Sequence, residues 1–166
     1  IGNRIDEGNL LNLIAVLLAE QGRLAEARTQ FEASVAISQE LGDRVAEGEV
    51  LHNLGCLHHE QERLDEARAV YEQSLVIHRE VGNRVFEGYV LGDLGRLHRQ
   101  QQRWADARAC LEQALAINRE TGDRRIEGAE LCSLGELFLA QGDERAARDA
   151  LAQAEEVLRQ FGDKHY

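Results

Sequence analysis

The heptapeptide GNRIDEG at residues 2–8 recurs as GDRVAEG at 42–48, as GNRVFEG at 82–88 and as GDRRIEG at 122–128. Each copy follows the previous one by 40 residues, and a further Gly-Asp pair stands in register at 162–163. A fixed internal period of this length is typical of proteins built from stacked, repeated supersecondary units. The repeats that we delimit are 3–42, 43–82, 83–122 and 123–162.

Each copy begins with a residue pair that suits the end of one helix and the start of the next. Gly42 precedes Asp43, and Gly followed by Asp or Asn recurs in the other copies. Glycine adopts the left-handed conformation that ends a helix, and an Asp or Asn side chain accepts the first amide hydrogens of the next helix. Between these joints, two helical patterns are separated by a short polar break such as Gln21-Gly22-Arg23. Each repeat is therefore predicted to be a helical hairpin.

Both helices of the predicted hairpin carry an apolar face. In the second repeat, Leu51 and Leu54 show helical spacing on the first helix, as Leu64, Ala67 and Tyr71 do on the second. One hairpin cannot bury both faces alone, so neighbouring hairpins must stack and share them. The chain also has no proline and only 5% aromatic residues. These features predict an all-α fold of stacked helical hairpins, which is a solenoid.

At these positions the sequence resembles the tetratricopeptide repeat (TPR) family, and the resemblance covers the whole chain. The matching residues are Leu51, Leu54, Gly55, His58, Ala67 and Tyr71 in the second repeat and Leu91, Leu94, Gly95, His98, Ala107 and Leu111 in the third. The resemblance implies a right-handed superhelical solenoid of antiparallel hairpins that binds a protein partner and has no catalytic activity. Its period of 40 residues is similar to the long-repeat class of Pins-type adaptors and bacterial TPR regulators.

The repeats extend to both ends of the chain. We therefore interpret residues 1–166 as a single TPR array and expect it to be a fragment of a longer protein. Residues 163–166 are predicted to start a further helix or a capping helix. Within the first helices, Gly8, Gly48 and their equivalents are expected to allow close approach of the preceding second helix, with the backbone of a bound peptide as the alternative.

Composition excludes several classes of partner. A formal net charge of −11 argues against binding to nucleic acid or to an anionic membrane, which needs a surplus of basic residues. No apolar stretch approaches the roughly 20 residues of a membrane-spanning helix. The three cysteines, Cys56, Cys110 and Cys132, are too few for a disulfide framework, so we expect a reducing, cytoplasmic location.

The resemblance also implies that the first helices line a concave groove. The predicted partner-binding residues are Asn9, Asn12, Glu49, His52, Asn53, Cys56, His59, Tyr89, Asp93, Arg96, Arg99 and Glu136. Among them, Arg96 and Arg99 form a basic pair with Tyr89 nearby. Such a pair can hold a carboxylate by charge-assisted hydrogen bonds while the ring packs an apolar side chain. We therefore expect a partner peptide or helix with an acidic residue at the third repeat.

The spacing of His52, Cys56 and His59 raises the alternatives of a metal site and a catalytic thiol. Zinc requires about four ligands, whereas His52 and His59 are separated by roughly 10 Å along a helix, and Arg96 and Arg99 oppose a cation. A nucleophilic thiol requires an oriented base and oxyanion donors, which a straight helix face does not supply. We therefore predict no metal, no cofactor and no enzyme activity, and interpret these residues as groove walls.

A second functional hypothesis remains open. If apolar faces at the ends of the array are uncovered, they can stack between molecules. The chain would then be a self-association or assembly module that works by end-to-end stacking of repeats.

Overall fold

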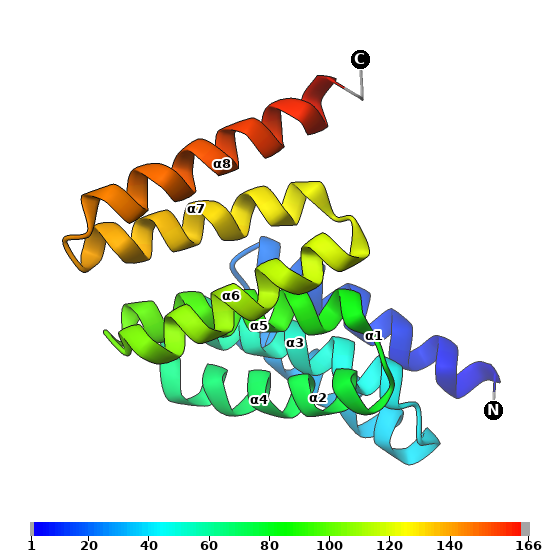
Figure 1. The fold of residues 1–166 in the computed structure, drawn as a ribbon. Coiled ribbons are helices and arrows are strands. Elements are labelled where there is room, and N and C mark those ends of the chain that lie inside the picture. The colour runs from blue at the N-terminus through cyan, green and yellow to red at the C-terminus, as the bar shows by residue number, and fades with distance from the viewer. Residues whose placement is uncertain (1, 164–166) are drawn as a thin grey trace. The chain divides into compact units, whose positions relative to one another are not determined.

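The protein is described here by a computed structural model that covers residues 2–163 (Figure 1). Within that range the regular structure consists of eight α-helices and no strand, so the prediction of an all-α fold is confirmed. The helices are α1 (Gly2–Glu20), α2 (Leu24–Leu41), α3 (Arg44–Glu60), α4 (Leu64–Glu80), α5 (Arg84–Gln100), α6 (Trp104–Thr121), α7 (Arg124–Ala140) and α8 (Glu144–Asp163).

The predicted joints between hairpins have the expected chemistry. Gly42 and Gly122 adopt left-handed φ values of 66° and 76°, which end α2 and α6. Asp43 then accepts a hydrogen bond from the amide of Ala46 at 3.0 Å and caps α3. Asp123 caps α7 in the same way at its own joint. Glycine and the acidic residue therefore stop one helix and start the next, as the sequence predicted.

The Gly-Asp pair at residues 162–163 behaves differently. Helix α8 continues through Gly162 and ends at Asp163, which was predicted to start a further or capping helix. Residues 164–166 lie outside the described residues. A glycine inside a helix costs only about 1 kcal/mol relative to alanine, so this dipeptide does not end a helix by itself.

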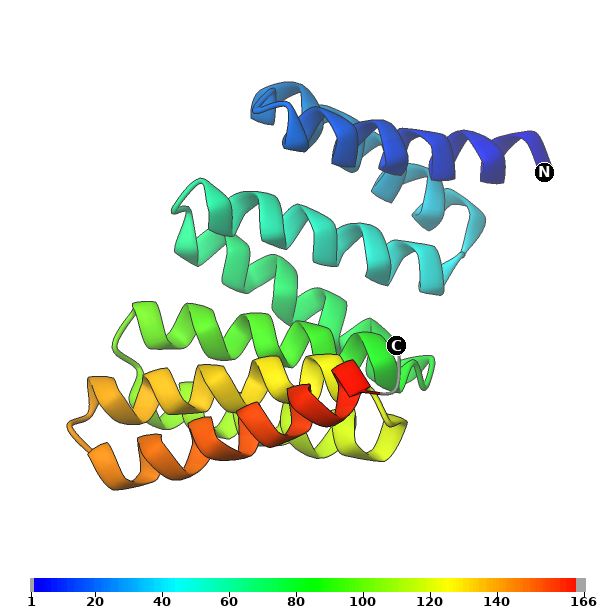
Figure 2. The same cartoon turned by 90° about the horizontal axis from the view of Figure 1, so that it is seen from above.

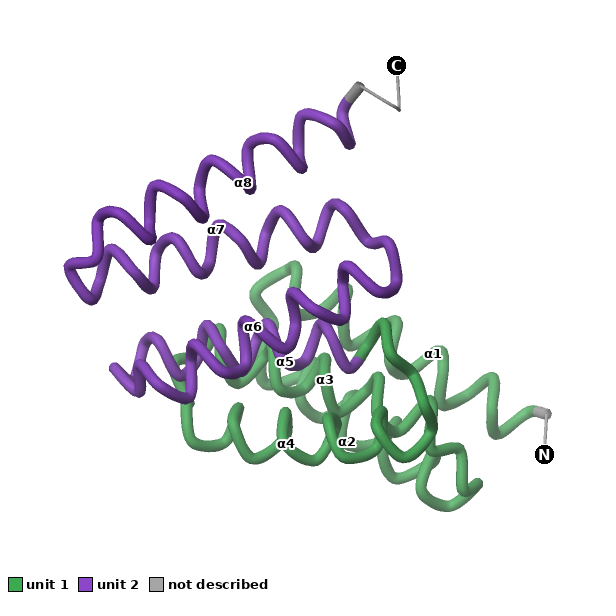
Figure 3. Tube along the Cα trace, in the orientation of Figure 1, with its two compact units in different colours: residues 1–86 green, residues 87–166 purple. Residues whose placement is uncertain are grey.

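The chain divides into two compact units, residues 1–86 and residues 87–166 (Figure 3). In unit 1, α1 pairs with α2 and α3 pairs with α4, and α2 also packs against α3. In unit 2, α6 packs against α7 and α7 against α8. Consecutive helices run antiparallel within each unit, as Figure 2 shows. Each unit is therefore built from helical hairpins.

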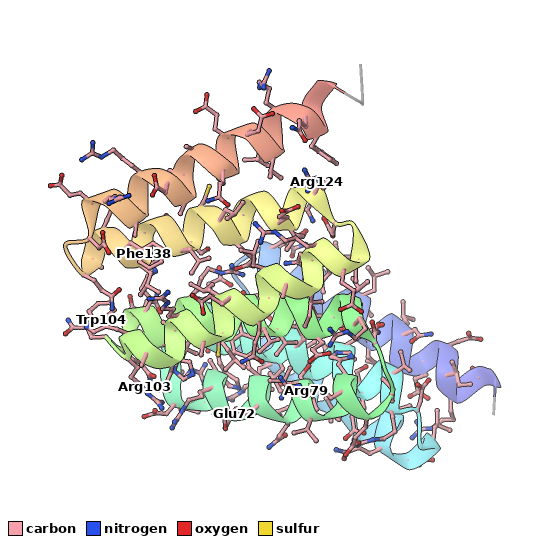
Figure 4. The ribbon with its side chains drawn as sticks, in the orientation of Figure 1. Glu72, Arg79, Arg103, Trp104, Arg124 and Phe138 are labelled. Atoms are coloured by element: carbon pink, nitrogen blue, oxygen red, sulfur yellow. The ribbon has the colours of Figure 1, made fainter. Side chains whose placement is uncertain are left out.

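Each unit has its own apolar core. In unit 1 the core joins α1, α2 and α3, with Phe31 and Leu54 among its buried residues. In unit 2 it joins α6, α7 and α8 through residues such as Leu111 and Leu134. Trp104 and Phe138, labelled in Figure 4, pack at the edge of this second core. Of the buried residues of this core, the sequence analysis named Ala107 and Leu111, through the resemblance to the repeat family.

The glycines near the start of the first helices do permit close helix contact, but the partner helix differs from the prediction. A Cβ atom on Gly48 would lie 2.8 Å from His78 Cε1, and one on Gly128 would lie 2.5 Å from Leu158 Cδ2. His78 and Leu158 belong to the second helix of the same repeat, whereas the preceding second helix was expected. The contact lies at the end of the hairpin that is far from the short break, where the missing Cβ atom lets the two helices of one repeat approach closely.

Candidate functional site

A groove of about 260 Å³ opens in unit 1 between α1, α2 and α3. We call it the α1–α3 groove. Its lining residues are Val16, Ala19, Glu20, Phe31, Asn53, Cys56, Leu57 and Glu60. Phe31 and Leu57 are buried and belong to the core of unit 1, so the floor of the groove is apolar.

Helical spacing places these residues on one surface. Asn53, Cys56 and Glu60 follow each other at intervals of three and four along α3, and therefore share one face of that helix. Val16 and Ala19 do the same on α1. The amide of Asn53 donates a hydrogen bond of 3.1 Å to the side-chain oxygen of Asn12, which ties α3 to α1 beside the groove.

The charged groups of the groove are carboxylates. Glu20 comes from the end of α1 and Glu60 from the end of α3, and both are exposed to solvent. Asn53 and Cys56 contribute neutral polar atoms between them. The groove therefore combines an apolar floor with an acidic rim, which attracts basic rather than acidic groups.

His52 and His59 flank a buried aromatic ring in unit 1. Their ring centroids lie 5.9 Å and 6.3 Å from that of Tyr71. His52 also contacts Phe86 edge to face at 6.1 Å. Its Nε2 atom lies 3.7 Å from Cys56 Sγ. The two histidines thus cover the Tyr71 ring, and one of them contacts the groove cysteine.

Two other predicted site residues of unit 1 lie away from the groove lining. Asn9 is exposed on α1. Glu49 is half-buried on α3, where burial, followed by repulsion from Asp43, raises the pKa of its carboxyl group. Of the predicted residues of unit 1, the groove lining therefore includes Asn53 and Cys56.

In unit 2, the predicted Asp93 and Arg96 form a network with a buried carboxylate. Arg96 donates to Asp93 at 2.7 Å and to Glu130 of α7 at 3.2 Å. Burial works to lower the pKa of Arg96, but the two carboxylates outweigh it and raise that pKa. Burial raises the pKa of Glu130 above its ordinary value, although Arg96 opposes this shift. This network joins α5 to α7.

The other predicted residues of unit 2 also have partners within the chain. Arg99 forms an ion pair of 2.8 Å with Glu136. The Tyr89 hydroxyl donates to Asp123 at 3.0 Å, and burial, followed by this hydrogen bond, raises the pKa of the phenol. The sequence analysis predicted that Arg96 and Arg99 bind a carboxylate of a partner. In the structure the chain itself supplies carboxylates to both.

Sequence reasoning missed several residues that matter at these sites. Phe31 forms the groove floor but belongs to a second helix, and the prediction considered only the exposed stripe of the first helices. Glu20 marks the acidic rim at the end of α1. Glu130 carried a signal that could have been used, because Val50 and Val90 are apolar at the same position of the repeat. A charge at a core position requires a partner.

These stacked helical hairpins define an all-α helical-repeat protein. The profile of the family described as "Tetratricopeptide repeat" matches residues 6–80 and 86–160. The chain belongs to the tetratricopeptide repeat family. Among the described helices, none is both long and apolar enough to cross a bilayer. A comparison with curated proteins finds no match.

Solved structures with similar folds come from several proteins. BtubC (BKLC) from P. vanneervenii is 21% identical over 93% of this chain and 64% of its own, with a TM-score of 0.85. A signal transduction ATPase with a tetratricopeptide repeat sensor, from Pyrococcus horikoshii, is 16% identical over 98% of this chain and 25% of its own, with a TM-score of 0.86. Aspartyl phosphate phosphatase F from Bacillus subtilis is 10% identical over 95% and 50%, with a TM-score of 0.72. The chain thus spans less than two thirds of each, and at these identities the likeness shows the fold alone.

Proposed function

We propose that this chain is a non-catalytic scaffold that binds a segment of a partner protein in the α1–α3 groove. The partner segment carries an apolar side chain next to one or more Lys or Arg residues. The observation that carries this proposal is an apolar floor, made by Phe31 and Leu57, beside the carboxylates of Glu20 and Glu60. A buried apolar anchor supplies affinity, and opposite charges at the rim supply orientation and on-rate.

The size of the groove supports a peptide rather than a metabolite. Pockets that enclose a drug-sized ligand usually measure about 300 to 1,000 Å³. The α1–α3 groove, at about 260 Å³, lies just below that range and is open to solvent. It accommodates one or two side chains of a longer segment that continues over the surface. This geometry favours protein recognition over binding of a small substrate.

The sequence prediction of an acidic partner residue at Arg96 and Arg99 stays a prediction, with less support than before. A partner carboxylate at Arg99 would have to compete with Glu136, which is 2.8 Å away. At Arg96 it would compete with Asp93 and Glu130, the second of which is buried. Charge complementarity therefore favours the acidic rim of unit 1 as the binding site.

The test uses two synthetic amphipathic peptides, one of leucine and lysine and its twin of leucine and glutamate, labelled for fluorescence anisotropy. We expect the basic peptide to bind and the acidic peptide not to bind. Replacing Ala19 with Trp fills the groove and should weaken binding at least tenfold, whereas Ala36→Trp on the exposed face of α2 should not. Equal binding by both tryptophan variants would contradict the proposed site.

A second pair of variants separates the groove from the general negative charge of the protein. The double variant Glu20→Lys, Glu60→Lys reverses the charge of the groove rim. The control double variant Glu32→Lys, Glu72→Lys makes the same change in net charge at exposed positions of α2 and α4. Only the first should abolish binding of the basic peptide. Equal losses would show non-specific attraction. If the acidic peptide binds the wild type but not the double variant Arg96→Ala, Arg99→Ala, the result would support a site at the third repeat instead.

A further inference from the structure

Within each unit, the second helix of one hairpin packs against the first helix of the next hairpin, α2 against α3 and α6 against α7. This contact is the template for the proposal that follows. In unit 1, Val50 and Leu57 on α3 join Phe31 of α2 in a buried cluster. In unit 2, Leu137 on α7 joins Leu111 of α6 in the same way. A second helix therefore covers the apolar face of the first helix that follows it.

Helix α1 presents this face to solvent. Leu10 and Leu17 occupy the positions of Val50 and Leu57 in the 40-residue register. Their exposed fractions are 56% and 47%, compared with 3% and 2% for the two residues on α3. Helix α1 thus carries the residue types that a second helix covers elsewhere in the chain, but here they are exposed.

Helix α8 presents the complementary face. Leu151 occupies the position of Phe31 and Leu111, which are buried against the following first helix. Its exposed fraction is 39%, and that of Leu158 on the same helix is 40%. Helix α8 is therefore a second helix whose covering face is still partly open.

The template also includes a polar contact between the two helices. In unit 1, Gln39 of α2 donates to Glu47 of α3 at 2.9 Å. In unit 2, Arg119 of α6 donates to Glu127 of α7 at 2.9 Å. Glu47 and Glu127 are buried by this arrangement, with 7% and 3% of their side chains exposed. The donor and the acceptor are eight residues apart in each case.

At the two ends of the repeat series, the donor position on α8 and the acceptor position on α1 hold residues of opposite charge. Arg159 of α8 is in register with the donors Gln39 and Arg119. Glu7 of α1 is in register with the acceptors Glu47 and Glu127. A donor on α8 and an acceptor on α1 therefore repeat the polar half of the template.

Both of these side chains are accessible, although each has a contact on its own helix. Glu7 is 49% exposed and pairs with Arg4, and Arg159 is 64% exposed and pairs with Glu156. Contacts of this kind do not prevent a further pairing. Glu127 pairs with Arg124 and Arg119 at once, so one carboxylate can serve two cations.

We propose that α8 of one copy stacks on α1 of another copy, so that the chain associates head to tail. In this contact Leu151 packs against the face that carries Leu10 and Leu17, and Arg159 binds Glu7 of the next copy. The contact joins two different surfaces, so each added copy leaves one α1 face and one α8 face open. Association of this kind increases with concentration and does not stop at the dimer.

Charge reversal at the two partner positions tests the proposal. Glu7→Arg places an arginine opposite Arg159, and Arg159→Glu places a glutamate opposite Glu7, so each variant alone should repel its own copies. Light scattering should show the mass of the wild type rising above 18.6 kDa with concentration, whereas each variant should stay at the monomer mass.

The mixture of the two variants gives the decisive result. The α8 end of each variant is opposite in charge to the α1 end of the other variant, whereas within either variant the two ends have the same charge. An equimolar mixture should therefore associate again, with the two variants alternating, although neither associates alone. A non-specific apolar contact would not depend on mixing in this way.

Matched controls guard against effects of folding or net charge. Arg145→Glu on α8 and Glu32→Arg on α2 reverse exposed charges away from the proposed contact and should associate as the wild type does. The repeat equivalents of Arg145, Ala25 and Ala105, are exposed beside the following first helix in the described structure. Thermal melting by circular dichroism checks that all variants are folded. A wild type that remains monomeric at every concentration, variants that associate normally, or a mixture that remains monomeric would each overturn the proposal.

Discussion

At the residue scale, the most unusual feature of the described structure is the buried carboxylate of Glu130. It is 1% exposed in unit 2 and occupies a position that holds valine in the two preceding repeats. Arg96 supplies its cationic partner, and Asp93 accepts a second hydrogen bond from the same guanidinium. The residue Gly92 makes room for it, because a Cβ atom there would lie 2.2 Å from Glu130 Oε1. The cost of removing both charges from water can exceed their attraction, so a buried ion pair of this type is weak evidence for stability.

The raised pKa of Glu130 predicts a particular pH dependence of stability. Burial places the folded-state pKa above the ordinary value of 4.5, so the folded state holds the proton more tightly than the unfolded state does. Stability from this group is therefore lost as the pH rises from about 4.5 through the folded-state pKa. The wild type should lose stability relative to Glu130→Gln across that window, as measured by urea unfolding at a series of pH values.

Removal of the cation provides the control for this experiment. Arg96 lowers the pKa of Glu130, so the variant Arg96→Met should move the same loss of stability to higher pH. If the wild type instead gained stability relative to Glu130→Gln as the pH rose, the assignment of burial as the dominant cause would be wrong.

This network also shows which part of the site the sequence could not predict. Arg96 and Asp93 lie three residues apart on a first helix, and the sequence analysis placed both on the exposed stripe. Their engagement with Glu130 depends on the reach of side chains between α5 and α7. Sequence periodicity assigns a residue to a face of a helix, but it does not specify which charge on a neighbouring helix will meet it.

At the element scale, the joints between hairpins determine where helices start. Asp43 caps α3 through the amide of Ala46. The second helix of a hairpin can start without such a cap: the side chain of Arg63, at the start of α4, forms no capping hydrogen bond. The acidic cap at the Asp43 joint is therefore a feature whose removal should weaken the following helix.

We predict that Asp43→Ala lowers the free energy of unfolding by about 0.5 to 2 kcal/mol, because an amide at the start of α3 loses its acceptor. Arg63→Ala is the matched variant and should have a smaller effect, since it removes no cap hydrogen bond. Urea denaturation followed by circular dichroism measures both. Similar losses for the two variants would argue against a specific role for the Asp43 cap.

The helices themselves were largely predictable from the sequence. Recurrent glycine and aspartate residues located the joints at Gly42 and Gly122, and apolar periodicity located buried residues such as Leu54 and Tyr71 of the second repeat. The exception was Gly162, where α8 continues without a break. A glycine that takes the left-handed conformation at one joint remains compatible with a helix at another, so its effect depends on the packing around it.

At the scale of the whole molecule, the two proposals assign different surfaces to different tasks. Recognition of a partner uses the α1–α3 groove, whose floor contains Phe31 and Leu57. Self-association uses Leu10 and Leu17 on α1 together with Leu151 on α8. Helix α1 contributes to both tasks through different residues. Variants in the groove should therefore change peptide binding without changing molar mass, and variants at Glu7 or Arg159 should do the reverse.

The central claim is that a partner segment binds in the acidic, apolar groove of unit 1. The most direct measurement is an NMR titration of the ¹⁵N-labelled chain with the leucine–lysine peptide, at a concentration where the protein is monomeric. We predict chemical shift changes concentrated at the amides of Val16, Ala19 and Cys56, with saturation as the peptide is added. Changes centred on Arg96 and Arg99, or weak changes spread over the whole surface without saturation, would contradict the claim.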